Sequence, residues 1–372
     1  MSYYLGIMSG TSVDGIDIGL FEFKEESHKD NIKTHCFDSF DFEPHLQETL
    51  KNIIKDQSGR LKTIGETDTE LGFSYARAIN IFLDQNNLTY KDITAIGCHG
   101  QTIFHHPQSQ FPFTWQLGNL SIVARETQIT TIGNFRALDM AYGGEGAPLA
   151  SKFHQHFFYD ENEIRLLLNL GGIANISCLN TENLIGFDTG PANCLLDLWI
   201  EKNFPDKTYD HNGDLATSGK VIEHLLKSLL NDPYFKKSYP KSTGKEYFNL
   251  NWLNNYLNNG IKNDDIADIQ ATLSELSAIT IADAIKLTQP KTQKIYLCGG
   301  GSFNHDLINR LQKQLKSISI VSSENLGVHP QSMESALMAW LAKRRLNHQI
   351  SNAPTVTGAT KELSLGTIYL SA

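Results

Sequence analysis

The hydrophobic pattern begins with two apolar runs separated by a turn-forming segment. Residues 3–8 are apolar and β-prone, residues 9–15 read Ser-Gly-Thr-Ser-Val-Asp-Gly, and residues 16–23 alternate between apolar and polar. This order predicts a β-hairpin at the start of the chain.

A second segment in the middle of the chain repeats this pattern. Residues 164–170 form an apolar run that ends at Gly171-Gly172, and apolar residues resume at 174–179. A short run at 184–187 then precedes Asp188-Thr189-Gly190-Pro191. The spacing between the two segments is too long for a solenoid repeat, so we expect one structural device used in each of two halves.

The remaining pattern predicts helices joined by short strands and irregular turns. Helical spacing occurs at 44–55, 66–84, from 149 to about 159, through most of 192–288 (including 213–230 and 266–287), and at 332–346; further strands are predicted at 92–97, 294–297 and 363–370. The glycine-dense residues 142–148 and His105-His106-Pro107 are expected to be loops. The alternation predicts an α/β fold.

Composition excludes several classes of protein. The 372 residues are 40% hydrophobic and 20% charged, as in an ordinary globular protein, and the formal net charge is −9. An acidic chain without a basic block is a poor binder of nucleic acid or of an anionic membrane. We therefore expect neither as a partner.

The cysteines and the N-terminal residues bear on the compartment. The five cysteines are scattered, odd in number and never spaced as CxxC, which favours a reducing environment. No basic and apolar leader opens the sequence, and no run of 18 apolar residues occurs. We expect a cytoplasmic protein.

The first turn carries the most informative chemistry. Glycines in Gly10–Asp17 let backbone N–H groups approach an anion closely, and the hydroxyls of Thr11 and Ser12 can add hydrogen bonds. Asp14 and Asp17 would repel a phosphate unless Mg²⁺ lay between them, usually through water. The alternative is a ligand-free Asp-Gly hairpin turn.

Two later glycine turns favour the ligand-binding alternative. Gly171-Gly172 and Gly299-Gly300-Gly301 each follow an apolar strand, which is where α/β sheets bind nucleotides. Three such turns in one chain favour a nucleotide site over three simple turns. The sequence has no GxxxxGK[ST], no strand-linked GxGxxG and no GxSxG.

Asp188 is the candidate catalytic carboxylate. It follows an apolar strand and precedes a proline, so it is expected to point into a cleft and to orient or deprotonate a hydroxyl or a water. The alternative is a capping residue for a helix that begins near Ala192.

Other polar residues give weaker signals. His154 and His156 lie two apart on a predicted helix and so do not share a face, which argues against a histidine metal site. Arg136 and Glu145 flank a glycine-rich region, where they could bind a sugar or form a surface ion pair. Glu334 is either a solvated helix charge or a cleft residue.

Motifs spread along the chain resemble those of the anhydro-N-acetylmuramic acid kinases. The resemblance covers nearly the whole chain in one register. It rests on Met8–Asp17, Cys98–Thr102, Asn134–Arg136, Gly143–Leu149, Asn169–Ser177, Gly186–Pro191, Lys241–Glu246, Gly299–Gly301 and Val356–Ala359.

The resemblance implies a fold and its domains. It implies the duplicated, ribonuclease H-like fold of the actin-like ATPases, in which two α/β domains surround a nucleotide cleft. We expect one domain at 1–132 plus about 353–372, with the first phosphate hairpin. The other is expected at 133–352, with Asp188, the second phosphate turn and the glycine-rich adenosine turn.

It also implies a reaction, in which 1,6-anhydro-N-acetylmuramic acid, ATP and water give N-acetylmuramate 6-phosphate and ADP during peptidoglycan recycling. Asp188 would deprotonate the water, with ATP and Mg²⁺ as cofactors and a homodimer possible. The phosphates and Mg²⁺ would be bound by Gly10, Thr11, Ser12, Val13, Asp14, Gly15, Ile16 and Asp17, and the nucleotide also by Gly171, Gly172, Gly299, Gly300 and Gly301. Gln101, Arg136 and Glu334 are the candidate sugar contacts.

Three positions depart from the family pattern as the resemblance defines it. Ala192 replaces a glycine, Asn134 replaces an aspartate, and Glu145 replaces a glutamine. None alters Asp188 or the first hairpin, so the departures concern only the finer sugar contacts.

Two further readings use the same fold. A kinase of an ordinary amino sugar would use Asp188 to deprotonate the sugar O6 and would consume no water. A sugar-sensing regulator would need a DNA-binding domain before the first hairpin, and a chaperone-type ATPase would need a client-binding domain. We expect neither domain here.

Overall fold

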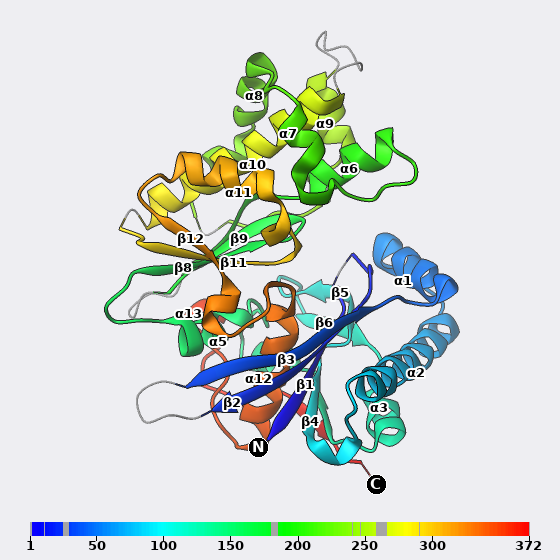
Figure 1. Cartoon of the computed structure of the whole chain (residues 1–372). Coiled ribbons are helices and arrows are strands. Elements are labelled where there is room, and N and C mark those ends of the chain that lie inside the picture. The colour runs from blue at the N-terminus through cyan, green and yellow to red at the C-terminus, as the bar shows by residue number, and fades with distance from the viewer. Residues whose placement is uncertain are drawn as a thin grey trace. The chain divides into compact units, whose positions relative to one another are not determined.

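The computed structural model describes residues 2–10, 12–24, 30–179, 185–239, 241–245, 247–257, 266–289 and 291–371 (Figure 1). The chain forms two compact units, unit 1 (residues 1–157 and 326–372) and unit 2 (residues 158–325). The expected boundaries lay at 132/133 and 352/353, so residues 133–157 and 326–352, which were expected in the second domain, lie in unit 1.

Unit 1 is built on a six-stranded mixed sheet. Strand β1 pairs antiparallel with β2 and parallel with β4, and the strand order is β13-β7-β4-β1-β2-β3. The strands are β1 (Tyr3–Met8), β2 (Ile16–Lys24), β3 (Asn31–Phe40), β4 (Ile93–Cys98), β7 (Thr131–Gly133) and β13 (Thr367–Tyr369). A separate hairpin joins β5 (Gln101–His106) to β6 (Phe113–Leu117).

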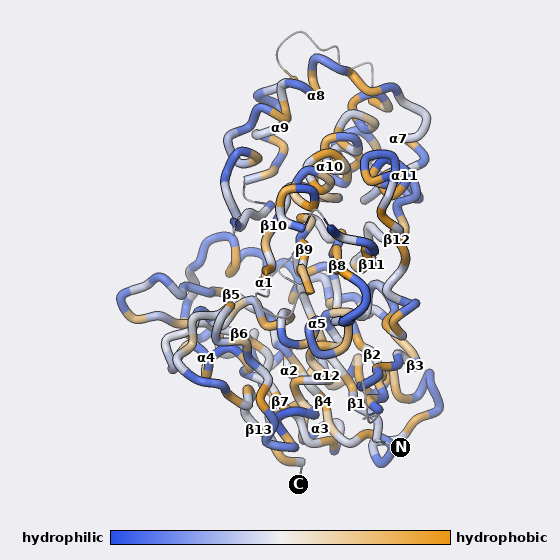
Figure 2. The backbone as a smooth tube through the Cα atoms, turned by 90° about the vertical axis from the view of Figure 1, so that its left-hand side faces the viewer, coloured by the Kyte–Doolittle hydropathy of each residue, from blue (hydrophilic) through white to orange (hydrophobic). Residues whose placement is uncertain are grey.

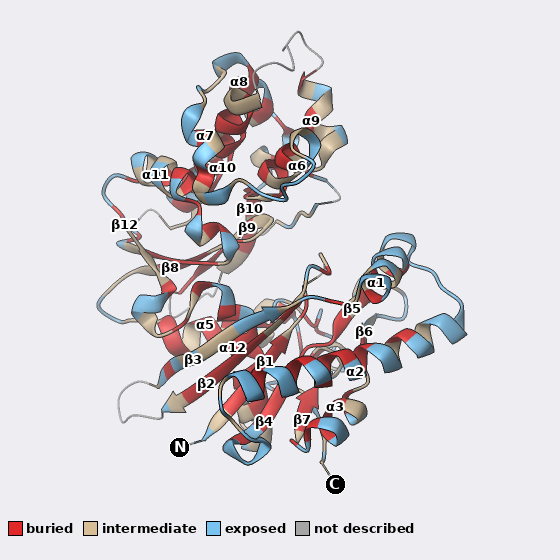
Figure 3. Cartoon of the chain, turned by 45° about the vertical axis from the view of Figure 1, so that its right-hand side comes forward, coloured by how far each residue is buried: buried red, intermediate tan, exposed pale blue. Residues whose placement is uncertain are grey.

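Unit 1 also contains α-helices, and several of them pack apolar residues against this sheet. The helices of unit 1 are α1 (Pro44–Asp56), α2 (Leu61–Gln85), α3 (Leu120–Thr127), α4 (Ala137–Ala141), α5 (Ala150–Phe158), α12 (Met333–Leu346) and α13 (Pro354–Thr357). Leu71, Tyr75, Ile79 and Phe82 of α2 are fully buried at helical spacing and share a core with Leu5 and Ile7 of β1. The buried inner strands are visible in Figure 3.

Three glycines explain why α12 belongs to unit 1. Gly6 is paired with Gly19 on one side and with Gly97 on the other, so the three form a row across the sheet. A Cβ atom on Gly6 would lie 1.7 Å from the carbonyl oxygen of Ser335, and one on Gly97 would lie 1.9 Å from that of Met338. The helix backbone therefore rests directly on the sheet.

Aromatic packing fixes α5 in the same unit. Phe153 packs against Trp340 of α12 with ring centroids 5.7 Å apart, and Phe157 packs against Phe23 of β2 at 5.8 Å. These long-range contacts, which the hydrophobic pattern does not reveal, account for the difference in domain boundaries.

Unit 2 repeats the sheet of unit 1. Its strand order is β10-β9-β8-β11-β12, with β8–β9 and β9–β10 antiparallel and β8–β11 and β11–β12 parallel. The strands are β8 (Arg165–Leu170), β9 (Ile173–Cys178), β10 (Ile185–Pro191), β11 (Lys294–Cys298) and β12 (Ser319–Ser322). The two sheets share five strands, which are β1, β2, β3, β4 and β7 in unit 1 and β8 to β12 in unit 2. Numbered in chain order within each unit, these strands lie in the order 3-2-1-4-5 in both sheets, which confirms the predicted duplicated α/β fold.

The helices of unit 2 are α6 (Cys194–Asn203), α7 (Asp214–Ser218), α8 (Glu223–Leu230), α9 (Leu250–Leu257), α10 (Ile266–Thr288) and α11 (His305–Gln314). Helix α10 is the central one, because Ile281 and Ile285 pack on the sheet while Ile269 and Leu273 pack with α6, α8 and α9. In Figure 2, where the backbone is coloured by hydropathy, hydrophobic (orange) residues recur along α10.

Two local expectations differ from the structure. His105 and His106 lie in β5 instead of a loop, because Phe104 and Phe113 pack edge to face across the β5–β6 hairpin. Within the predicted strand 363–370, only Thr367–Tyr369 pair with β7. Among the described residues, no helix combines the length and apolar character needed to span a membrane.

Candidate functional site

The turn between β1 and β2 is braced by hydrogen bonds from two glutamines. The N–H of Val13 donates to the carbonyl of Gly10 (3.0 Å), and Val13 has a positive φ of 55°. Gln47 Nε2 donates to the carbonyl of Val13 (2.8 Å), and Gln101 Nε2 donates to that of Gly10 (3.1 Å). The turn is thus held in shape by α1 and β5.

The predicted phosphate-contact residues fall into two groups. Val13 and Ile16 point into the core and are each only 1% exposed, so their side chains are not available to a ligand. Ser12 is half-buried and Asp14 is exposed. Thr11 lies outside the described residues.

Gln101 has an unused acceptor. Its side chain is fully buried, and Oε1 has no hydrogen-bond partner among the described residues. A buried amide oxygen without a partner is costly, so a ligand hydroxyl or an ordered water would stabilise this position. The sequence analysis named Gln101 as a sugar contact, and the structure adds its role in bracing Gly10.

Carboxylates of unit 1 influence one another beside this turn. Burial raises the pKa of Asp17, the charge of Asp14 raises it further, and a hydrogen bond from Ser39 opposes the shift. The pKa of Glu334, in the first turn of α12, is raised by desolvation and by Asp17, while Arg136 opposes the shift. This grouping of negative charge suits a nearby cation.

Arg136 is oriented by a neutral histidine. His99 Nδ1 donates to the carbonyl of Gly100 (2.7 Å), which leaves Nε2 free to accept a hydrogen bond from Arg136 Nε (3.1 Å). Arg136 Nη1 also donates to the carbonyl of Gly146 (2.7 Å). Burial, with the charge of Arg136 as a second cause, lowers the pKa of His99 to about 3, so the ring stays neutral at physiological pH.

His99 makes stability depend on pH. The unfolded chain binds a proton at His99 below the usual pKa of about 6.5, whereas the folded chain does so only near 3, so stability falls as pH drops through this window. We expect His99→Gln to reduce the slope of unfolding free energy against pH, between pH 5.5 and 4.5, by about 1.4 kcal/mol per pH unit. Urea unfolding at several pH values measures this slope, with His348→Gln at an exposed position as the control. An unchanged slope in His99→Gln would contradict the assignment.

The glycine-rich loop 143–148 is fastened by one buried aspartate. Asp139 accepts hydrogen bonds from the N–H of Gly146 (2.9 Å), from Asn352 Nδ2 (3.0 Å) and from Thr357 Oγ1 (2.9 Å). Glu145 is exposed and accepts a hydrogen bond from Gln108 Nε2 (2.6 Å) instead of pairing with Arg136. The alternative of a surface ion pair between Arg136 and Glu145 is therefore not realised.

In unit 2, the turn Gly171-Gly172 is tied to the start of α6. The N–H groups of Asn193 and Cys194 donate to the carbonyls of Gly171 (3.1 Å) and Gly172 (3.0 Å). Asn193 Nδ2 donates to the carbonyls of Leu170 and Gly171 as well. The turn and the helix N-terminus thus form one structural element.

The third glycine turn lies at the same edge of this sheet. Strands β8 and β11 are parallel, and Cys298 is level with Asn169, so both strands end together. A Cβ atom on Gly299 would lie 2.3 Å from Asn169 Oδ1, and one on Gly301 would lie 2.5 Å from Asn193 Nδ2. The sequence predicted both turns, and the fold brings them side by side.

Lys245 is a residue that sequence reasoning did not single out. Its Cε would lie 2.8 Å, and its Nζ 3.7 Å, from a Cβ atom on Gly172. At the N-terminus of α6, burial raises the pKa of Cys194 to about 12, and the positive charge of Lys245 partly opposes this rise. The exposed Lys245 ammonium has no ion-pair partner among the described residues. Its position inside a motif of the resemblance, Lys241–Glu246, was the available signal.

Asp188 is held by the same segment. It lies within β10 and is half-buried, and its Oδ2 accepts hydrogen bonds from Ser242 Oγ (2.9 Å) and from the N–H of Thr243 (3.0 Å). Its own N–H donates to the carbonyl of Lys241 (3.0 Å), and its carbonyl accepts from Tyr234 OH (2.7 Å). Helix α6 has Asn193 as its N-cap, so the capping alternative for Asp188 is wrong.

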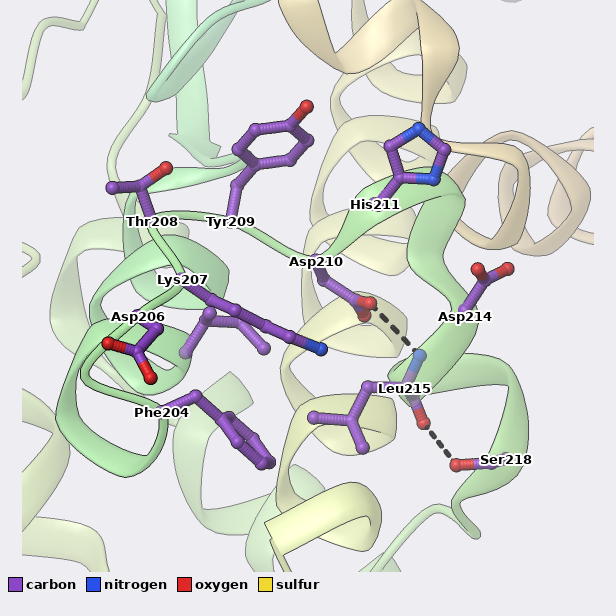
Figure 4. Close-up of a pocket in the computed structure, with 11 residues that line it drawn as sticks. Phe204, Asp206, Lys207, Thr208, Tyr209, Asp210, His211, Asp214, Leu215 and Ser218 are labelled. Atoms are coloured by element: carbon purple, nitrogen blue, oxygen red, sulfur yellow. Dashed lines mark hydrogen bonds between the residues drawn. The ribbon is translucent and has the colours of Figure 1, made fainter.

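An acidic pocket of about 540 Å³ lies between the end of α6 and α7 (Figure 4). Phe204 and Leu215 line it together with the carboxylates of Asp206 and Asp214. Asp210 accepts hydrogen bonds from the N–H groups of Leu215 (2.9 Å) and Ala216 (3.0 Å). Among the described residues, no group of three or more His, Cys, Asp or Glu side chains is arranged to hold a metal ion.

The repeated 3-2-1-4-5 sheets, with glycine turns at the strand ends, place the protein in the actin-like ATPase class. The model of the family described as "Anhydro-N-acetylmuramic acid kinase" matches residues 2–371. The chain belongs to this family.

Relatives bearing that family's name cover almost the whole chain. Anhydro-N-acetylmuramic acid kinase of Coxiella burnetii (strain Dugway 5J108-111) is 44% identical and covers 98% of this chain and 97% of its own. The Pasteurella multocida protein of the same name is 43% identical, covering 99% and 96%. The Xylella fastidiosa (strain Temecula1 / ATCC 700964) protein is 42% identical, covering 98% and 96%.

Solved structures match the chain at much lower sequence identity. The activator of 2-hydroxyisocaproyl-CoA dehydratase from Clostridium difficile, with bound ADPNP, has a TM-score of 0.46 at 12% identity and covers 94% of this chain and 99% of its own. A ROK family glucokinase from Streptomyces griseus, in complex with glucose and AMPPNP, has a TM-score of 0.40 at 12% identity, covering 92% and 100%.

Proposed function

We propose that the protein is an ATP-dependent kinase that opens 1,6-anhydro-N-acetylmuramic acid with water and phosphorylates it to N-acetylmuramate 6-phosphate. The observation that carries the chemistry is the carboxylate of Asp188, held by Ser242 and the backbone of Thr243. Membership of the family supports the choice of substrate.

The reaction is balanced by one proton transfer and one phosphoryl transfer. Asp188 accepts a proton from a water, whose oxygen forms a bond to the anomeric carbon while the bond from that carbon to O6 breaks. O6 then takes the γ-phosphoryl group and ADP leaves. Ser242 and Thr243 hold the carboxylate through Oδ2 and so orient it for accepting the proton.

Phosphate binding is proposed for both glycine-rich hairpins. In unit 1, the N–H groups around Gly10 and Gly15 and the hydroxyl of Ser12 would donate to phosphate oxygens. In unit 2, the N–H groups of Gly171 and Gly172 and the ammonium of Lys245 form a second donor set. A phosphate bound at this turn would form an ion pair with Lys245, for which the described residues provide no acidic partner.

Asp14 and Asp17 are the residues proposed to hold Mg²⁺, through water. Their mutual repulsion, which contributes to the raised pKa of Asp17, would be relieved by a divalent cation, so these residues fit the ion. Bound Mg²⁺ supplies charge neutralisation for the phosphates.

The base and ribose are proposed to lie beside the turn Gly299–Gly301. This turn leads into Asn304, and a Cβ atom on Gly213 would lie 2.4 Å from Asn304 Oδ1. Gly213 precedes Asp214, at the edge of the acidic pocket, so the pocket and the turn are neighbours. Carboxylates at such an edge can accept hydrogen bonds from ribose hydroxyls.

The cellular setting follows from the same proposal. The anhydro sugar is a product of cell-wall turnover, so the reaction belongs to peptidoglycan recycling. None of the five cysteines, all of which lie in the part of the chain that the structure describes, forms a disulfide bond, and four are buried, which supports a reducing compartment such as the cytoplasm. A homodimer remains an expectation from the resemblance.

Replacing Lys245 tests the phosphate contact. We expect Lys245→Met to weaken ATP binding by roughly 10- to 100-fold, because a hydrogen bond to a charged group is worth about 1.5–3 kcal/mol. Lys245→Arg is expected to restore most of it. Calorimetric titration with ATP and Mg²⁺ measures the affinity, and Lys316→Met at an exposed position is the control. An ATP affinity equal to that of the wild type would remove Lys245 from the site.

The proposed reaction is tested by its product. The protein is incubated with the anhydro sugar, ATP and Mg²⁺ in ¹⁸O-labelled water, and early samples are analysed by mass spectrometry. One ¹⁸O at the anomeric position of a 6-phosphosugar is expected. An untouched anhydro sugar, with N-acetylglucosamine or N-acetylmuramate phosphorylated instead, would contradict the proposed substrate.

A further inference from the structure

A second pocket, of about 300 Å³, lies on the face of β10 that carries Phe187 and Thr189. Successive residues of a strand point to opposite faces, so this pocket lies behind the position of Asp188. Its other walls come from α10, from Leu230 of α8, and from residues 235–237, Tyr239 and Lys241. All of it belongs to unit 2.

The walls of this pocket are partly apolar and flat. Phe187 stacks on Tyr239 with ring centroids 5.4 Å apart and an interplanar angle of 18°. Leu287 at the rim is 69% exposed, which is unusual for a large apolar side chain beside a cavity. The volume is at the lower end of the range for small-molecule sites, so the pocket fits one aromatic or fused-ring group.

The pocket is also positively charged. Lys236, Lys237 and Lys241 line it, and the carboxylate that faces them, Asp283, is paired with Lys286 of α10 (3.8 Å). Burial, and then the charge of Lys237, lowers the pKa of Lys241, which indicates that its ammonium lacks full hydration. An anion would relieve both effects.

The wall of the pocket continues into the groups that hold Asp188. Lys241 Nζ donates to the carbonyl of Tyr234 (3.3 Å), and Tyr234 OH donates to the carbonyl of Asp188 (2.7 Å). The next two residues, Ser242 and Thr243, donate to the Asp188 carboxylate. A ligand that moves Lys241 would therefore move the donors to this carboxylate.

We propose that this pocket is a ligand site for an organic anion with a flat apolar group, and that its occupation changes the reaction rate at Asp188. Binding at the pocket is independent of the proposed kinase activity, whereas the effect on rate rests on it. A rate effect requires that the ligand prefers one arrangement of the 235–243 segment over another.

The probe for this test is 8-anilinonaphthalene-1-sulfonate, an anion with a flat apolar ring system whose fluorescence rises on binding. It is titrated into the full chain in the presence of excess ATP, which excludes binding at the glycine turns. We expect Lys237→Glu to weaken binding at least tenfold, and Ala284→Trp, which fills the pocket from α10, to abolish it. Lys227→Glu, on the exposed face of α8, is the control and is expected to bind as the wild type does.

The second measurement is kcat for the anhydro sugar with and without the probe at saturating substrates. At least a twofold change is expected in the wild type, and none in Lys237→Glu at the same probe concentration. Equal affinity in the wild type and both pocket variants would overturn the site, and a kcat that does not respond to bound probe would overturn its coupling to Asp188. If the chain does not act on the anhydro sugar at all, the proposed function fails, while the titration still decides whether the site exists.

Discussion

Asp188→Asn is expected to lower kcat for the anhydro sugar by about 10²- to 10⁴-fold, the usual contribution of a general base. The amide keeps the size of the carboxylate, and its oxygen can still accept the hydrogen bonds from Ser242 and Thr243. What it loses is the ability to take a proton from water. Initial rates of ADP release in the presence of the sugar measure the change, and ATP affinity is expected to stay within twofold of the wild type.

Two variants serve as comparisons for Asp188→Asn. Glu223→Gln removes an exposed carboxylate of the same unit, outside both pockets, and is expected to leave kcat unchanged within twofold. Ser242→Ala keeps the Asp188 carboxylate and its hydrogen bond from Thr243, so a loss of only about tenfold is expected. If Asp188→Asn retains more than a tenth of the wild-type kcat, Asp188 is not the base.

Gly97→Ala is expected to be strongly destabilising for a change that adds a single methyl group. The new Cβ would lie 1.9 Å from the carbonyl oxygen of Met338, in the backbone of α12, so the helix must move away from the sheet. Such overpacking costs about 1–3 kcal/mol or more in free energy of unfolding. Chemical unfolding monitored by circular dichroism measures it.

The control for this substitution is Gly65→Ala. Gly65 lies in α2, is exposed, and has no atom within 4 Å of the position that a methyl group would take, so alanine there is expected to stabilise the chain by about 0.5–1 kcal/mol. The two glycine-to-alanine changes should therefore have opposite signs. Equal stability of Gly97→Ala and the wild type would mean that α12 is not seated on the glycine row.

Gly97→Ala is also expected to disturb the charged residues of the candidate site. Glu334 lies in the first turn of α12, and its pKa responds to both Asp17 and Arg136. A helix displaced from Gly6 and Gly97 would change these interactions. Activity of Gly97→Ala is expected to fall even at temperatures where the chain remains folded.

The sequence by itself determined the elements that depend on local chemistry. Turn formers between alternating apolar runs were enough to find the β1–β2 and β8–β9 hairpins, because strand and turn preferences act over a few residues. The motifs were enough to identify the family, because membership of a family depends on residue identities along the chain. Asp188, the three glycine turns and Gln101 were all named on this basis.

Only the tertiary structure decided what depends on contacts between distant residues. Gly6, Gly19 and Gly97 look unrelated along the chain, and their row appears only when β1 pairs with β2 and β4. That row carries α12, which is why residues 326–352 belong to unit 1. Likewise, the position of Lys245 beside Gly172 is set by the packing of unit 2. Residue preferences act locally, whereas burial and hydrogen bonding select partners from anywhere in the chain, so the sequence named the groups of the candidate site and the fold determined which of them meet.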